Sequence, residues 1–256
     1  MYNVERYERG LKRYPKAGWK AMLGVIHPEG AVAGPNDFRK LAPPGVAMSL
    51  LYVPLHKDES TEEMIKLGDR VVEIASGRVF KQWQCDVILW LCTAGSFLRG
   101  IGYDQQLIKG IQDATGIPAT TTSTAMMEAF KALGMKKIVA VTPYPDSANQ
   151  LEKKFMEANG VEVLEISGFD DRDHRDLISR HPHDYYELLK KLDRPDADGL
   201  FISCTGLDVM DLIEPMEQEL GKPVVTSNQA SFWKAFSMAR VTDPINNYGK
   251  LFRLQR

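Results

Sequence analysis

The sequence predicts an α/β fold of two pseudo-symmetric, doubly wound lobes, each with a mainly parallel sheet flanked by helices, and an active site in the cleft between them. Apolar runs of strand length alternate with amphipathic segments of helix length, the pattern of βαβ units around a parallel sheet. The two halves of the chain carry the same landmarks in the same order. The 256 residues suffice for two compact halves, each of roughly 120 residues.

The runs that predict strands are rich in β-branched residues and have the length of buried parallel strands. In chain order they are Met22–Ile26, Val46–Val53, Val87–Leu91, Lys137–Val141, Val161–Ile166, Gly199–Ser203 and Pro223–Thr226. Segments between them show apolar residues at helical spacing. They predict helices that include Thr61–Trp83, Thr124–Leu133, Asp146–Asn159, Asp184–Leu192 and Asp208–Leu220.

Each half contains a strand that ends at a proline, then an asparagine, a Gly-Val pair, an apolar strand that runs into Cys-Thr, and a Gly-x-Pro. In the first half these landmarks lie at Pro28, Asn36, Gly45, Cys92 and Gly116, and in the second at Pro143, Asn149, Gly160, Cys204 and Gly221. Their shared order and nearly constant spacing predict two like lobes. We place the first lobe at residues 1–121, completed by 228–256, and the second at 122–227.

Charge and hydropathy exclude several classes of partner. The 32 basic and 34 acidic residues give a formal net charge of −2, so no overall field would attract nucleic acid or an anionic membrane. No apolar run approaches the ~18 to 20 residues of a membrane span, and the charged, aromatic opening Met1–Lys20 is unlike a signal peptide. We therefore expect a cytoplasmic protein with a small-molecule partner, and we allow for a homo-oligomer.

The sequence contains three cysteines, an odd number in a chain expected in a reducing compartment, so they are predicted to be free thiols. Cys92 and Cys204 each follow an apolar strand, at the end where open parallel sheets bind ligands. Either one alone could be a buried small apolar residue. Their duplication favours a thiol from each lobe in one pocket, whereas Cys85 has no counterpart and is predicted to be buried filling.

Two opposed thiols suit proton transfer at a carbon next to a carboxylate. One thiol can remove the proton and the other can return it, because the unperturbed thiol pKa of about 8.5 is close to cellular pH. A thiolate can also add to a carbon–carbon double bond, allow rotation and leave. Cys92 and Cys204 are therefore the predicted catalytic residues.

Small, hydroxyl and amide residues near the cysteines predict a carboxylate pocket. The candidate substrate-binding residues are Pro28, Thr93, Ser96, Ser123, Tyr144, Asn149, Thr205, Gly206 and Asn228. The hydroxyl-rich stretches have a second interpretation as helix N-caps, with Ser123 or Thr124 as the cap of the helix that follows.

Other motifs indicate no cofactor or metal. No glycine-rich phosphate loop follows a predicted strand, and no serine nucleophile elbow is present. A histidine and aspartate segment could in principle bind a metal but reads better as a solvated loop; its members are His174, His181, His183, Asp170, Asp171, Asp173 and Asp184. The basic N-terminal segment is predicted to be a surface arm; its members are Arg6, Arg9, Lys12, Arg13, Lys16 and Lys20.

The chain resembles the aspartate/glutamate racemase superfamily, and within it the arylmalonate decarboxylase and maleate cis-trans isomerase branch. The resemblance runs from about Lys20 to Phe252. It rests on Gly24-Val25-Ile26-His27-Pro28, Cys92-Thr93-Ala94-Gly95-Ser96-Phe97, Gly116-Ile117-Pro118, Ser123-Thr124-Ala125, Ala132-Leu133-Gly134, Thr142-Pro143-Tyr144, Asn149, Ser203-Cys204, Gly221-Lys222-Pro223-Val224-Val225 and Ser227-Asn228-Gln229.

The resemblance implies two lobes that enclose a substrate without a cofactor. It implies that Cys204 matches the cysteine with which the decarboxylases protonate their product, and that Thr93 and Tyr144 match residues that hold a carboxylate. Racemases and maleate isomerases carry a cysteine at the position of Cys92, where the decarboxylase pattern has glycine. Cys92 thus favours two-thiol chemistry.

We therefore expect a cofactor-independent isomerase, either a racemase or a cis-trans isomerase, of a small mono- or dicarboxylic acid. The first alternative is an arylmalonate-type decarboxylase in which Cys204 alone donates the proton and Cys92 is incidental. The alternative from another class is a two-lobed carboxylate-binding protein without turnover.

Overall fold

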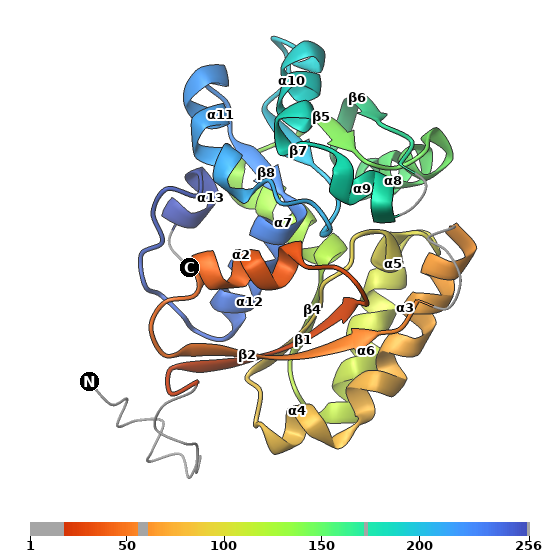
Figure 1. The fold of residues 1–256 in the computed structure, drawn as a ribbon, viewed down its shortest axis with the longest axis vertical. Coiled ribbons are helices and arrows are strands. Elements are labelled where there is room, and N and C mark those ends of the chain that lie inside the picture. Colours follow the sequence, from red (N-terminus) through yellow and green to blue (C-terminus); the bar gives the residue numbers. More distant parts are fainter. Residues whose placement is uncertain (1–17, 56–60, 172–173, 255–256) are drawn as a thin grey trace.

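A computed structural model describes residues 18–55, 61–171 and 174–254, and these form two four-stranded sheets. The first sheet has the order β2-β1-β3-β4 and the second β6-β5-β7-β8, and the paired strands are parallel throughout. The strands are β1 (Ala21–Pro28), β2 (Val46–Val53), β3 (Val87–Trp90), β4 (Ala119–Thr121), β5 (Lys137–Thr142), β6 (Glu162–Gly168), β7 (Gly199–Ile202) and β8 (Val224–Thr226). The identical strand order confirms the predicted two-lobed α/β fold (Figure 1).

Helices flank both sheets (Figure 1). They are α2 (Ala33–Leu41), α3 (Thr61–Ser76), α4 (Arg78–Gln82), α5 (Ala94–Phe97), α6 (Tyr103–Thr115), α7 (Thr122–Leu133), α8 (Asp146–Ala158), α9 (His174–Ser179), α10 (Pro182–Leu192), α11 (Ile213–Leu220), α12 (Ser227–Met238) and α13 (Lys250–Arg253), with a 3-10 turn at Met210–Leu212. None of the helices in the described part of the chain is both long and apolar enough to cross a membrane.

Each predicted strand is present, and its ends are displaced by no more than about two residues. The structure differs from the prediction in three elements. The predicted helix Thr61–Trp83 is interrupted at Gly77, which separates α3 from α4. The short β4 was not predicted, because two of its three residues are threonines and it lacks an apolar run. The helical segment expected from Asp208 begins with a 3-10 turn at Met210.

The sheets are covered by two hydrophobic layers. Val25 and Leu89 point into a core that continues across both lobes, whereas Ile26 and Trp90 point into the layer formed with α3 and α6. Between the sheets, α12 packs against α7, α2 and β3. The last strand of each sheet leads directly into one of these two inner helices, β4 into α7 and β8 into α12. The predicted lobe boundaries fall at or next to these two junctions.

The two junctions have the same capping. Thr121 has extended backbone angles and its side chain accepts a hydrogen bond from the Thr124 backbone N–H, so Thr121 caps α7. Thr226 does the same for α12 with the N–H of Gln229. The cap of α7 is thus Thr121, two and three residues before the predicted Ser123 and Thr124. The strand itself supplies the cap because its last residue still has the extended conformation that a cap requires.

Candidate active site

Cys92 lies in the loop between β3 and α5, and only 3% of it is exposed. Its Sγ accepts a hydrogen bond from the backbone N–H of Gly95 at 3.3 Å. An N–H donor of this kind favours the thiolate over the thiol. A Cβ atom at Gly95 would stand 3.1 Å from this Sγ and 2.8 Å from the Trp90 ring, so only glycine fits here without displacement.

Cys204 occupies the corresponding place after β7 and is partly exposed. Its Sγ accepts a hydrogen bond from the N–H of Gly206 at 3.3 Å, which repeats the arrangement at Cys92. The backbone of Cys204 has a φ of 102°, a conformation that favours glycine. A side chain in such a conformation costs on the order of 1–3 kcal/mol and is typical of functional sites.

The hydroxyl group of Ser227 links the two cysteine loops. It accepts hydrogen bonds from Thr93 Oγ1 at 2.9 Å and from the backbone N–H of Cys204 at 3.0 Å. Ser227 is the first residue of α12, directly after β8. Thr93 follows Cys92 in sequence, so the carboxyl end of β3 in one sheet and that of β7 in the other meet at this hydroxyl group.

Tyr144 follows β5 and lies close to both thiols. Its pKa is raised well above the ordinary value, first by desolvation of the hydroxyl group and then by negative charge on Cys204, Glu152 and Cys92. A hydrogen bond to Cys204 acts in the same direction. Tyr144 therefore keeps its proton and can donate a hydrogen bond to an anion.

Asn149 holds the turn that carries Tyr144. Its Oδ1 accepts a 2.6 Å hydrogen bond from Thr142 Oγ1, and its Nδ2 donates to the carbonyl oxygen of Tyr144 at 3.3 Å. The N–H of Tyr144 donates to Thr142 Oγ1 at 2.9 Å. Asn149, predicted as a substrate-binding residue, thus contributes to the site through the position of Tyr144.

Ser96 and Ser123 lie beneath the Cys92 loop, and both are fully buried. Ser96 Oγ is within hydrogen-bond distance of the carbonyl oxygens of Cys92 and Thr93, at 2.8 and 2.9 Å, and of Ser123 Oγ at 2.6 Å. The two serines therefore fix the loop from below.

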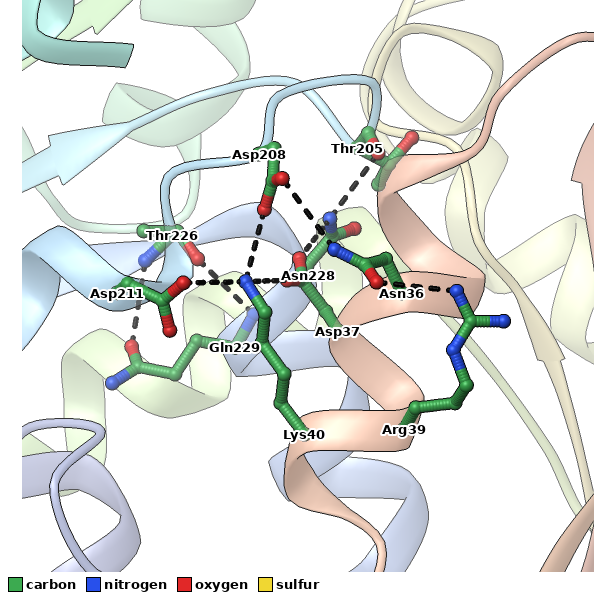
Figure 2. Close-up of polar contacts among 10 residues, drawn as sticks. All are labelled: Asn36, Asp37, Arg39, Lys40, Thr205, Asp208, Asp211, Thr226, Asn228 and Gln229. Atoms are coloured by element: carbon green, nitrogen blue, oxygen red, sulfur yellow. Dashed lines mark hydrogen bonds and ion pairs between the residues drawn. The ribbon is translucent and has the colours of Figure 1, made fainter.

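Asn228 holds the loop after Cys204. Its Nδ2 donates to the carbonyl oxygen of Thr205 at 3.2 Å and to Asp37 Oδ2 at 2.8 Å, which ties this loop to α2 (Figure 2). Burial raises the pKa of Asp37 to about 7. Lys40 lies one turn further along α2. It forms ion pairs with Asp208 at 3.1 Å, with Asp211 at 2.7 Å and with Asp37 at 3.8 Å (Figure 2).

The structure also places the remaining predicted residues. Pro28 is buried at the carboxyl end of β1, in register with Val53 of β2. Beside it, His27 Nδ1 lies 2.6 Å from the carbonyl oxygen of Leu91, and burial lowers the His27 pKa to about 4. A Cβ on Gly206 would meet Leu177 Cδ2 at 2.6 Å, so α9 lies against the Cys204 loop.

Some residues around the site were not predicted from the sequence. They are Ser203, Ser227 as the link between the loops, Glu152, and the α2 residues Asp37 and Lys40. Only Glu152 leaves a clear signal in the sequence: it is an acidic residue on the apolar face of α8, at helical spacing from the buried residues Asn149, Phe155 and Met156.

The other cysteine lies outside the site, and His181 and His183 have contacts of their own within α10. Cys85 is buried in the outer layer of the first sheet, and the three cysteines form no disulfide. His181 caps α10, and His183 Nε2 lies 3.3 Å from Glu187. No group of three or more His, Cys, Asp or Glu side chains in the described part of the chain could hold a metal ion. Asp173 and the basic arm up to Lys16 lie outside the described residues.

Comparison with known proteins places this geometry in context. A family model described as arylmalonate decarboxylase matches residues 23–252. The chain is similar to the arylmalonate decarboxylase of Bordetella bronchiseptica, with 29% identity over 243 residues, 90% of this chain and 95% of the relative. It is also similar to the maleate isomerase of Geobacillus stearothermophilus, with 23% identity over 200 residues, 75% of this chain and 77% of the relative.

A solved structure shows the same fold. It is a cysteine-to-serine mutant of the maleate cis-trans isomerase of Nocardia farcinica with a covalently bound succinylcysteine intermediate. The TM-score is 0.85 at 16% identity, and the match covers 91% of this chain and 98% of that chain.

Proposed function

This chain belongs to the arylmalonate decarboxylase family, and we propose that it is a cofactor-independent isomerase of a small carboxylic acid in which Cys92 and Cys204 act as a pair. Its relatives are isomerases and a decarboxylase, so the chain is an enzyme of one of these two kinds. The choice of isomerase rests on the second cysteine, because a decarboxylase needs only one proton donor.

One observation carries the proposal. The Ser227 hydroxyl group contacts both Thr93 and the backbone of Cys204, so the two cysteine loops meet at a single atom. Each thiol also accepts an N–H from a nearby glycine, Gly95 or Gly206, so both sulfur atoms have a donor that stabilises a thiolate. A small acid bound next to Tyr144 would be near both.

Racemisation would use the two sulfur atoms in turn. One thiolate takes the proton from the carbon next to the carboxylate, and the electron pair moves onto the carboxylate as an enediolate. The opposite thiol then donates its proton to the other face of the carbon and becomes the thiolate. The neutral hydroxyl group of Tyr144 would donate a hydrogen bond to this negative charge.

A cis-trans isomerase would use one sulfur atom as a nucleophile. The thiolate forms a bond to one alkene carbon, and the π electron pair moves toward the carboxylate on the other. The former double bond between the two carbons is now a single bond and can rotate. The sulfur then leaves as the electron pair re-forms the double bond. The succinylcysteine of the Nocardia farcinica enzyme supports this route as one that the fold can accommodate.

The second candidate is a decarboxylase, which the family model and the Bordetella bronchiseptica relative favour. A malonate-type acid would lose carbon dioxide and leave an enediolate, and the Cys204 thiol would protonate it. Cys92 would then be dispensable. The third expectation, a carboxylate-binding protein without turnover, is not favoured, because the relatives are enzymes.

Proton NMR in deuterated water with maleate, 2-aryl acids and disubstituted malonates separates these reactions. Deuterium at the α-carbon without loss of carbon dioxide indicates a racemase, a change of alkene geometry a cis-trans isomerase, and release of carbon dioxide a decarboxylase. We expect Cys92→Ala and Cys204→Ala each to remove nearly all turnover. Full activity in both single variants would exclude the proposal, and activity kept only in Cys92→Ala would favour the decarboxylase.

A further inference from the structure

Glu152 is a carboxyl group without a role in the chemistry described above. It lies on the inward face of α8 and is fully buried. Phe155, on the same face, contacts the ring of Phe97, which in turn contacts the ring of Tyr144. An acidic side chain in such apolar surroundings is unfavourable unless it is neutral or well bonded.

The only hydrogen bond that the Glu152 side chain makes within the described residues leads to the Cys204 loop. Ser203 Oγ donates to Glu152 Oε1 at 2.6 Å, and Ser203 directly precedes Cys204. The other oxygen, Oε2, is buried and has no hydrogen-bond partner among the described residues. No basic side chain in the described part of the chain forms an ion pair with Glu152. The carboxyl group thus has a hydrogen bond at one oxygen and no hydrogen bond at the other among the described residues.

We propose that Glu152 is a positioning residue for Cys204: through Ser203 it fixes the peptide that carries the cysteine, and in its protonated form it keeps negative charge away from the thiolate. This inference rests on the proposed function, in which Cys204 reacts as a thiolate. It adds a residue that neither the thiol pair nor the carboxylate pocket includes.

The geometry of Cys204 explains why anchoring matters. Its backbone has a φ of 102°, and such a conformation persists only when the surroundings hold it. Ser227 holds the N–H of Cys204 at 3.0 Å, and Glu152 holds the side chain of the preceding Ser203 at 2.6 Å. Without Glu152, one of these two attachments is lost and the sulfur is free to shift.

The electrostatic part follows from the same location. Burial raises the pKa of Glu152 to about 8, with the Ser203 hydrogen bond acting in the opposite direction. Glu152 also contributes to the raised pKa of Tyr144, whose hydroxyl group faces Cys204 and Cys92. Ionisation of Glu152 would add a negative charge to this group of residues and disfavour the thiolate of Cys204.

The other ionisable groups near Cys204 are on different elements. Burial, and after it negative charge on Cys204, raises the pKa of Tyr185 of α10. The Tyr185 hydroxyl group donates a hydrogen bond to Asp171 at 3.2 Å. Asp171 is paired with Arg180. All three remain unchanged in the variants below, so a difference between the variants reports on Glu152 alone.

The test measures alkylation of Cys204 by iodoacetamide as a function of pH. Cys85→Ser and Cys92→Ser leave Cys204 as the only thiol of the full-length chain. The protein with Glu152, which is the parent, is compared with E152Q and E152L in this background. E157Q is the matched control, because Glu157 lies on the same helix but is exposed. E152Q keeps an oxygen for Ser203 but cannot ionise, whereas E152L removes the acceptor.

With Glu152 present, we expect the alkylation rate to depend on two ionisations, that of the thiol and that of a group near pH 8. E152Q should show only the ionisation of the Cys204 thiol, at a lower pH than in the parent. Its alkylation rate at neutral pH should lie within roughly threefold of the parent rate. E152L should alkylate roughly tenfold or more slowly at neutral pH, and E157Q should match the parent. A folded E152L that alkylates at the parent rate would overturn the positioning role, and an E152Q profile that coincides with that of the parent at every pH would overturn the electrostatic role.

Two further measurements keep the interpretation clear. Circular dichroism establishes that each variant is folded, and if E152L is not, E152Q alone decides the question through the shape of its pH profile. Alkylation requires no substrate. Failure of the proposed function would therefore appear as absence of turnover in the unmodified protein, whereas failure of this inference would appear as an unchanged alkylation profile.

Discussion

Thr93 and Ser227 are joined by a buried hydrogen bond of 2.9 Å between residues 134 positions apart in sequence. The bond connects the loop after β3 to the first turn of α12. Ser227 also accepts the N–H of Cys204, so this one hydroxyl group fixes the relative position of the two cysteine loops.

Ser227→Ala should lower kcat by roughly tenfold to a hundredfold, because loss of the shared acceptor lets the two cysteine loops move apart. The buried Thr93 hydroxyl group and the partly buried N–H of Cys204 both lose their partner, so we expect a decrease in the free energy of unfolding of about 1–3 kcal/mol. Steady-state kinetics and urea unfolding measure the two effects. Ser237→Ala, near the other end of α12, is the control; an equal loss of activity in both variants would contradict the prediction.

Tyr144→Phe should lower kcat/KM by roughly tenfold or more while the free energy of unfolding changes by less than about 1 kcal/mol. The hydroxyl group that faces both thiols is lost, but the ring keeps its contact with Phe97. Kinetics and thermal unfolding of the two proteins provide the measurement. An unchanged kcat/KM would exclude Tyr144 from the site.

Asp37→Asn should stabilise the protein more at pH 8 than at pH 4.5. The folded-state pKa of Asp37 is raised from 3.8 to about 7, so the carboxyl group favours the folded state below pH 4 and this contribution is lost as the pH rises through 7. The asparagine does not titrate, so its advantage over aspartate should grow across this range by up to about 4 kcal/mol. Urea unfolding at both pH values tests this, and an equal difference at both would refute it.

His27→Phe should remove part of the acid sensitivity of the fold. The folded-state pKa of His27 is lowered from 6.5 to about 4, so its contribution to stability is present above pH 6.5 and is lost as the pH falls through 4. Over this range the wild-type protein should lose up to about 3 kcal/mol relative to the variant. Unfolding curves at pH 7 and pH 4.5 measure the free energy of unfolding of both proteins. The wild-type protein should lose more of it than the variant between these pH values, and equal losses in the two proteins would contradict the prediction.

The sequence was sufficient for the fold because the two sheets repeat one pattern. Matching landmarks such as Cys92 and Cys204 follow corresponding strands of the βαβ units in the two halves. The structure shows the same strand order in both sheets. The short β4 escaped prediction because three residues with two threonines carry no periodicity of their own. Its strand character comes from pairing with β3, a tertiary contact.

The site was predictable only where local sequence carries the function. Thr93 and Tyr144 follow strand ends, so their places could be inferred from topology. The connections of Ser227 and Asp37 could not, because each depends on a partner more than a hundred residues away. Glu152 illustrates the intermediate case: its helical spacing marks it as buried, yet nothing in the sequence indicates that Ser203 is its partner.

The position of Ser227 has a consequence for how the protein is made. The hydroxyl group that Thr93 needs belongs to the last strand-to-helix junction of the second sheet, so it leaves the ribosome long after the first sheet has been synthesised. Until α12 arrives to cover β3 and α2, the nascent amino-terminal half carries an unfinished cysteine loop and an uncovered apolar face. The cysteine loop of the amino-terminal half is therefore completed only after α12 has been synthesised.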